Sequence, residues 1–150
     1  MRNLVWVCLL CVPLIAASLA QAEPDRQPIG LVKAVGGDAT ILREGRRVTA
    51  QPGIQLFQGD VLATGSSGSL GVILRDDTVL TLGPSSETHL EQFAFKPAEQ
   101  KLGMVLKFTR GMISYLSGKV AKLAPGSVRL ETPTATLGVR GTYLAVRIEP

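Results

Sequence analysis

The residues of this chain that could do chemistry are few. Its single histidine, His89, stands two residues before Glu91, a spacing that places both side chains on one face of a β-strand. Such a pair could serve as the base for a serine nucleophile, and Ser85 and Ser86 lie nearby in the sequence. No Gly-x-Ser-x-Gly segment is present to expose a serine. The pattern therefore favours an exposed strand histidine between polar neighbours, and we expect no catalytic residue and no enzyme activity.

Two other groups of residues suggest ion or cofactor sites, but neither has a full ligand set. Asp76-Asp77 offers two adjacent carboxylates, whereas Ca²⁺ takes about six or more oxygen ligands. The pair is expected to cap the amides of a turn instead. The glycine-rich segment 65–69 lacks the Gly-Lys-Ser/Thr ending of a phosphate-binding loop. We therefore expect no metal and no cofactor.

The N-terminus has the pattern of a secretory signal peptide. Arg2 precedes an uncharged apolar run over residues 4–19, and Ala20-Gln21-Ala22 follows it with small residues. We predict a signal peptide over residues 1–22, cut between Ala22 and Glu23. Both cysteines of the chain lie inside it, which leaves no thiol in the mature protein for a disulfide, a nucleophile or a zinc site.

The predicted mature protein is exported, and its expected compartment is the periplasm. The apolar run is interrupted by Pro13 and is shorter than the roughly 20 residues of a membrane span, so no transmembrane segment is expected after cleavage. The net charge of +4 could suggest nucleic acid, with Arg43, Arg46 and Arg47 as a small cluster. Export removes the chain from nucleic acid, and the only tryptophan leaves with the signal peptide. A nucleic-acid partner is therefore not expected.

The sequence after a flexible lead-in over residues 23–28 is typical of many short strands separated by glycine turns. Alternation is clearest at residues 70–75, where Leu70, Val72 and Leu74 share one face, and it resumes at residues 78–82 to form a hairpin. Further strands are expected at residues 30–37, 39–43, 47–49, 102–108, 112–116, 128–131 and 143–148. These elements predict a single all-β domain over residues 29–150.

Three details of this pattern can be checked against the fold. Residues 97–102 could open a helix, and we favour a strand with a short helical turn before it. After Arg110-Gly111, the alternation continues through Met112, Ser114 and Leu116. The alternating Phe93-Ala94-Phe95 is interpreted as buried strand aromatics, with an exposed partner-binding patch as the alternative.

Three stretches, at residues 58–65, 74–86 and 132–143, resemble the FecR domain, the periplasmic module of ferric-citrate-type transmembrane regulators. The resemblance covers residues 29–148, and Asp77 departs from the glycine that is usual there. We expect structural roles for the motif residues, and for Arg140 in particular bonds to nearby carbonyls or a carboxylate. The motif residues are Gly59, Asp60, Thr64, Gly65, Asp76, Thr78, Thr132, Pro133, Val139, Arg140, Gly141 and Thr142.

The resemblance implies a solenoid-like β-roll, and an irregular sandwich is the alternative architecture. It also implies a non-enzymatic exported interaction module, as a part of envelope sensing or signalling, that binds an unidentified envelope protein. The alternative function is binding of cell-wall or surface polysaccharide. Because the chain begins with a signal peptide and ends soon after Thr142, no direct contact with a sigma factor is expected. A link to iron uptake, the identity of the partner and the oligomeric state stay open.

Overall fold

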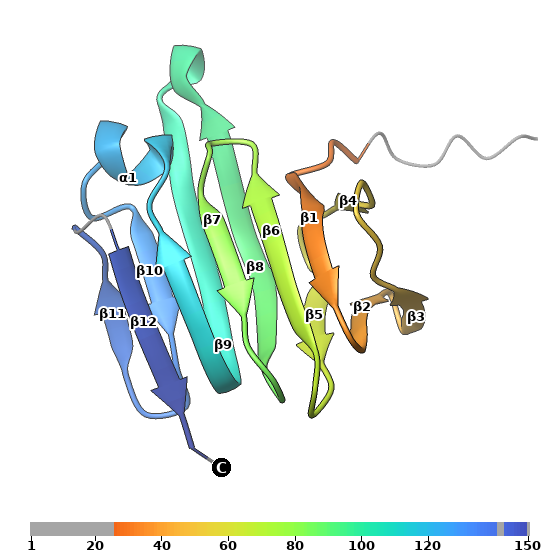
Figure 1. Cartoon of the computed structure of the whole chain (residues 1–150). Coiled ribbons are helices and arrows are strands. Elements are labelled where there is room, and N and C mark those ends of the chain that lie inside the picture. Colours follow the sequence, from red (N-terminus) through yellow and green to blue (C-terminus); the bar gives the residue numbers. More distant parts are fainter. Residues whose placement is uncertain (1–25, 141–142, 150) are drawn as a thin grey trace, which may run out of the picture.

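The computed structural model of the chain describes residues 26–140 and 143–149, which form a curled sheet of short strands (Figure 1). The predicted signal peptide with its Ala22–Glu23 cleavage site lies outside the described residues, as do Gly141 and Thr142 of the family motif. The strands are β1 (Gly30–Gly36), β2 (Ala39–Arg43), β3 (Arg46–Thr49), β4 (Gln55–Leu56), β5 (Val61–Thr64), β6 (Ser69–Leu74), β7 (Val79–Leu82), β8 (Glu87–Lys96), β9 (Lys101–Leu116), β10 (Val128–Glu131), β11 (Thr136–Gly138) and β12 (Tyr143–Ile148). The helical elements are one 3-10 turn (Pro97–Glu99) and the short helix α1 (Lys119–Leu123).

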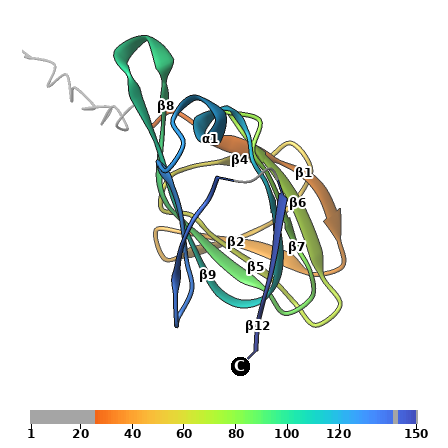
Figure 2. The same ribbon diagram turned by 90° about the vertical axis from the view of Figure 1, so that its left-hand side faces the viewer.

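One long strand, β9, joins the two halves of the sheet. The strand order is β3-β2-β5-β8-β9-β7-β6-β1-β4, and all these pairs are antiparallel. The first part of β9 pairs with β8 and, in parallel, with β10, whereas its last residues pair with β7 and β12. The sheet therefore curls around an interior, as Figure 2 shows. The predicted all-β single domain is confirmed, and its two halves are rolled about a shared strand.

The predicted hairpin at residues 70–82 is confirmed as β6 and β7, with Leu70 opposite Leu82 and Val72 opposite Leu80. These four side chains are at most 1% exposed, because the period of two turns every second residue toward the interior. The tip of the hairpin contains Asp77 with a φ of 69°, in the left-handed region that glycine adopts most easily. The departure from glycine noted in the sequence thus falls at a position that requires this backbone conformation.

The alternation expected through Met112, Ser114 and Leu116 does not mark the buried face of the second part of β9. Met112 and Leu116 are 43% and 45% exposed, whereas Ile113 and Tyr115 are fully buried. The cause is a β-bulge at Thr109, because Phe108 lies opposite Thr88 and Arg110 lies opposite Glu87, and this extra residue shifts the alternation by one position. Apolar alternation alone does not show such a shift, because both faces of this segment carry apolar side chains.

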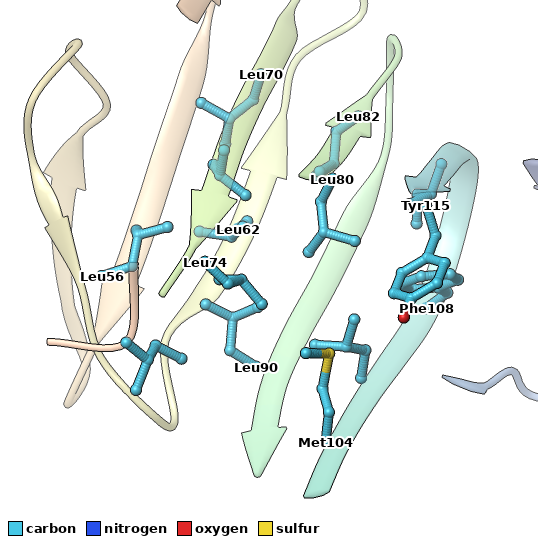
Figure 3. Packing of buried hydrophobic residues seen from close by; sticks show 14 of the residues in the cluster. Leu56, Leu62, Leu70, Leu74, Leu80, Leu82, Leu90, Met104, Phe108 and Tyr115 are labelled. Carbon is cyan, nitrogen blue, oxygen red and sulfur yellow. The ribbon is translucent and has the colours of Figure 1, made fainter. Parts of the chain in front are cut away.

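Leucine side chains from both halves of the sheet fill the interior between them (Figure 3). Leu62 and Leu90 come from the β5–β8 side, and Leu74 and Leu80 come from the β6–β7 side. Phe108 and Tyr115 supply the largest fully buried side chains, one from each part of β9. Burial of this apolar surface is the main force that holds the two halves together.

The β8–β9 hairpin extends beyond the ends of β6 and β7 (Figure 1). Its tip is the 3-10 turn, followed by a residue with a left-handed backbone, Gln100, and then by β9. The predicted short helical turn followed by a strand is therefore confirmed. Among the residues that the structure describes, no helix is long and apolar enough to cross a membrane.

Candidate functional site

His89 lies on β8 beside two carboxylates. Its Nε2 atom is 3.2 Å from Oε1 of Glu87, and its Nδ1 atom is 3.8 Å from Oε1 of Glu91. The spacing of two residues that pointed to Glu91 also holds for Glu87, so the same rule could have found the nearer partner. The side chain is 31% exposed, so the histidine that was expected to be exposed is only partly so. The hydroxyl group of Ser86 donates to the carbonyl oxygen of Met112, so it is not paired with this histidine.

Carboxylates and the histidine do not gather into a metal site. No group of three or more histidine, cysteine, aspartate or glutamate side chains is placed to hold a metal ion within residues 26–140 and 143–149. The carboxylate of Glu87 is instead stabilised by hydrogen bonds and an ion pair. Thr109 Oγ1 donates to its Oε1 atom at 3.1 Å, and Arg110 Nη2 lies 3.2 Å from its Oε2 atom. Burial alone raises the pKa of Glu87, but these partners and His89 outweigh it and lower that pKa below the ordinary value of 4.5.

The first motif stretch forms a buried ion pair. Asp60 is 1% exposed, and Arg43 donates to both of its carboxylate oxygens, at 2.9 and 2.8 Å. The backbone N–H of Phe57 donates to the same carboxylate at 2.9 Å, and the guanidinium group lies 4.6 Å from the centre of the Phe57 ring. The hydrogen bond with Asp60 raises the pKa of Arg43. The pair fixes the loop between β4 and β5 to the end of β2, and it removes Arg43 from the basic cluster noted in the sequence.

Thr64, from the same stretch, holds the corner at which β9 changes partners. Its hydroxyl group donates to the carbonyl oxygen of Gly83 at 2.6 Å and accepts from the N–H of Ser86 at 2.9 Å. The Ser86 hydroxyl group in turn accepts from the N–H of Met112 at 2.9 Å. A Cβ atom at Gly111 would lie 2.2 Å from the Ser86 hydroxyl oxygen and 2.5 Å from its Cα, so only glycine fits there.

The second motif stretch ties the β6–β7 turn to α1. Asp76 is fully buried, and its carboxylate accepts from the N–H and the hydroxyl group of Thr78 and from the N–H of Val120. The Thr78 hydroxyl group accepts from the N–H of Gly118, and the carbonyl oxygen of Asp76 accepts from the N–H of Lys119 at 2.6 Å. Asp76 therefore caps turn amides, as expected, and also anchors a segment more than 40 residues further along the chain.

The adjacent carboxylate, Asp77, has a different environment. It is 59% exposed and pairs with the ammonium group of Lys119 at 2.8 Å. This hydrogen bond raises the pKa of Lys119. The two aspartates thus face different surroundings and do not form a joint cation site.

The glycines of the first motif stretch occupy turns around β5. Gly59 has a φ of 92°, and Gly65 donates its N–H to the carbonyl oxygen of Asp38 at 2.8 Å. A Cβ atom at Gly59 would meet nothing within 4 Å. Glycine is therefore favoured at this position by the backbone conformation alone and not by a lack of space.

The third motif stretch forms the β10–β11 turn and the strand that follows. The Thr132 hydroxyl group accepts from the N–H of Ala135 at 3.1 Å, with Pro133 exposed in the bend between them. Val139 is 5% exposed and packs in the interior. Arg140 is exposed, and no hydrogen bond or ion pair links it to the other described residues. Its expected bonds to carbonyls or a carboxylate therefore stay a prediction.

A pocket of about 570 Å³ lies between the β8–β9 hairpin and the start of β1. Its aromatic lining comes from Phe93 and Phe95 of β8 and from Phe57, which follows β4. The phenylalanines of β8 are half-buried and pack against the core, which lies between the expected buried aromatics and the alternative of an exposed patch. The alternation of Phe93 and Phe95 in the sequence already placed both rings on one face of β8, where they line the pocket. The side chains across the pocket come from residues 26–29, about 65 positions earlier, which strand patterns do not connect to β8.

The charged lining of this pocket is entirely cationic. Arg26, Arg75, Lys96 and Lys101 line it, and no aspartate or glutamate does. Arg75 donates from Nη1 to Oε1 of Gln27 at 3.3 Å, which leaves the rest of its guanidinium group available. The pocket thus combines positive charge with an apolar floor, a combination suited to an anionic ligand that also carries apolar groups.

Comparison with known proteins identifies the family. The family model described as FecR protein matches residues 60–150, which is more than half of the chain. The chain belongs to the FecR family. No curated protein and no solved structure matches it. Residues 29–59 precede the matched region, yet β1 pairs with β6 and β2 pairs with β5, so both regions belong to one sheet.

Membership fixes the general class of this protein. The FecR family is a regulatory, non-enzymatic family of envelope signalling, and its domains are periplasmic. Within this FecR domain, Asp60, Thr64, Asp76 and Thr78 of the motifs are buried and bonded internally. The hydrogen bonds of these side chains stabilise the fold, whereas the cationic side chains of the pocket line an opening.

Proposed function

We propose that this protein is an exported, non-enzymatic binding module of the cell envelope that takes part in sensing or signalling by holding a partner protein. The single observation that supports the proposal most is the pocket beside β8, with three phenylalanines and four cationic side chains. Aromatic and arginine side chains are the types most enriched at the energetic centres of protein interfaces. The domain extends over residues 29–150 in this proposal, after a signal peptide cut between Ala22 and Glu23.

A photo-crosslinking experiment in living cells tests the partner. The amino acid p-benzoylphenylalanine replaces Phe95 in the pocket, and, in a matched control, Thr81, which is exposed on β7. We expect one defined envelope protein attached to the variant at position 95 and none to the variant at position 81. The proposal fails if the two positions give the same set of products.

The alternative function, binding of an anionic wall or surface polysaccharide, is supported by the cationic lining alone. It predicts that the protein co-sediments with peptidoglycan sacculi and that digestion of the glycan abolishes crosslinking at Phe95. We favour a protein partner because phenylalanine, which carries no polar group, offers a sugar only a stacking surface.

The absence of enzyme activity is also a proposal, and His89 is the residue that tests it. Its neighbours Glu87 and Glu91 are the only described carboxylates within 4 Å of its ring nitrogens. Hydrolysis of esters, peptides or glycans that the His89→Ala variant loses would contradict a non-enzymatic role. We expect the variant and the parent protein to be equally inactive.

A further inference from the structure

The edge of β8 beside the pocket has no neighbouring strand along part of its length. β5 pairs with β8 only from Glu87 to His89, and backbone hydrogen bonds from Gly59 and to Asp60 extend the contact as far as Leu90. β9 covers the other edge of β8 up to its last residue. Among the described residues, no strand pairs with the outer edge of β8 beyond Leu90.

A side chain takes the place of a strand at this edge. The backbone N–H of Phe93 donates to Oε1 of Gln58 at 3.2 Å, at an exposed position. In an antiparallel ladder the backbone groups alternate in direction, so those of Phe95 point the same way as those of Phe93, away from β9. A single exposed amide is a weak partner that water or another backbone can replace. The backbone groups of Phe93 and Phe95 on the outer edge of β8 could therefore form hydrogen bonds with an added strand.

The pocket runs along this same edge. Phe93, Phe95 and Lys96 of β8 line it, and so do Ile29, Phe57 and Gln58 from earlier parts of the chain. Alternate side chains of an extended peptide point to opposite sides, so a strand paired to Phe93–Phe95 would direct every second side chain toward the apolar floor. Affinity in such complexes comes from main-chain hydrogen bonds and specificity from the pockets between them.

The charge of the lining selects the composition of the peptide. Arg26 pairs with Glu44, and Lys96 and Lys101 both pair with Glu99, but neither glutamate lines the pocket. Arg75 has no ion pair among the described residues, so acidic residues in the ligand would meet its free charge and an excess of cations over carboxylates around it. An oligosaccharide would match the charge but has no backbone amides to pair with the strand edge, so the edge favours a peptide.

We propose that the outer edge of β8 over residues Phe93 to Phe95 binds an acidic, extended segment of the partner protein as an added β-strand, with apolar side chains of that segment in the pocket. This inference rests on the proposed function and deepens it by naming the chemistry of the partner segment. It concerns one mode of binding, so it can fail while a protein partner is still held in another way.

The test uses fluorescence anisotropy with protein purified from cells that express the whole chain. The probe is a fluorescein-labelled eight-residue peptide of alternating glutamate and leucine. We expect the parent protein to bind it about tenfold more tightly than a lysine–leucine peptide, and affinity to fall as salt rises. A version of the acidic peptide that is N-methylated on alternate amides, on the side that pairs with β8, is expected to lose about tenfold, because it cannot complete the ladder.

Charge-reversal variants locate the site. The double variant Arg75→Glu, Lys101→Glu is expected to lose affinity for the acidic peptide by about tenfold or more. The matched control is Lys33→Glu, Lys107→Glu, which reverses two exposed cations outside the pocket and is expected to bind like the parent. In the ¹⁵N–¹H spectrum, the amides of Phe93 and Phe95 are expected to shift on addition of the acidic peptide.

Three results would overturn the inference. One is equal binding of the N-methylated and unmodified peptides, which would exclude strand addition. Another is equal loss in the pocket variant and its control, which would show attraction to net charge alone. The third is binding to sacculi that the pocket variant loses while the peptide does not bind. If the peptide fails but crosslinking at Phe95 still captures a protein, the inference is wrong and the proposed function stands.

Discussion

The two polar regions of this FecR domain use charged side chains in opposite ways. Inside the curled sheet, Asp60 and Asp76 are almost completely buried, and every described contact of their carboxylates is made within the chain. At the pocket, Arg75 and Lys101 line an opening together with phenylalanine side chains, and no carboxylate lines it. The buried motif residues thus stabilise the domain, and the residues that line the pocket lie largely outside the motifs.

The difference shows that a conspicuous sequence motif need not mark a binding site. A buried carboxylate carries a large desolvation cost, which makes complete hydrogen bonding a condition of folding. An exposed cation carries little such cost and can vary without unfolding the protein. Substitutions in the two regions should therefore separate stability from binding.

The largest loss of stability is expected from a substitution in the interior region, at Gly111, where β9 changes its partner strands. Gly111→Ala is expected to lower the free energy of unfolding by about 3–5 kcal/mol, because a left-handed alanine adds to the overlap with Ser86. Gly126→Ala is the matched control, since its φ is 89° but a Cβ there meets nothing within 4 Å. We expect a loss of only about 1–2 kcal/mol in the control by urea denaturation. Equal losses would show that packing at the corner is not the constraint.

The next effect distinguishes the two adjacent aspartates. In Asp76→Asn, the amide group must oppose either the N–H of Val120 or the N–H of Thr78, so we expect a loss of about 2–3 kcal/mol. Asp77→Asn has the same change of chemistry at a 59% exposed side chain, and asparagine tolerates a left-handed backbone. The free energy of unfolding should stay close to that of the parent. Similar losses at both positions would contradict the anchoring role of Asp76.

A smaller effect concerns acid stability. Because the pKa of Glu87 is lowered in the folded protein, its contribution is fully present above the unfolded value near 4.5 and is lost as pH falls through the folded pKa. Glu87→Gln should therefore lower the free energy of unfolding at pH 7. In this variant the free energy of unfolding should also decline less steeply as the pH falls below about 4.5. Urea denaturation across this pH range measures both. Glu131→Gln is the control, and an equally flattened curve there would assign the effect to net charge.

The smallest expected effect on stability is at the pocket. The double variant Arg75→Glu, Lys101→Glu should change the free energy of unfolding by no more than about 1 kcal/mol, because the hydrogen bonds of Arg75 to Gln27 and Pro28 are exposed. Its circular-dichroism spectrum should match that of the parent, although its peptide affinity falls. A loss of stability as large as that of Asp76→Asn would erase the distinction between the two regions.

The local parts of this fold could be predicted from the sequence. The β6–β7 hairpin and the inward face of β9 before Gly111 follow from alternation, which a strand expresses residue by residue. The cap at Asp76 follows from turn chemistry, which also acts over a few positions. These predictions needed no knowledge of what lies across the interior.

The parts that failed depend on distant segments. The bond between Arg43 and Asp60 and the pocket between residues 26–29 and β8 both require the strand order, which periodicity does not encode. The exposed face of Met112 and Leu116 could not be predicted because a β-bulge at Thr109 shifts the alternation without altering the apolar pattern. Helix α1 has only five residues, too few to show a helical period.

The shared strand β9 also has a consequence for how the protein reaches its native state during synthesis. β1 can pair only after β6 has been made, and β5 only after β8. β7 and β8 both pair with β9, which ends only at Leu116. Such distant pairings make folding slow and leave leucine-rich ribbons uncovered in the growing polypeptide. A nascent chain stalled before residue 101 should therefore depend on a chaperone, and the interior closes fully only after Val128, Leu130 and Val139 have joined it.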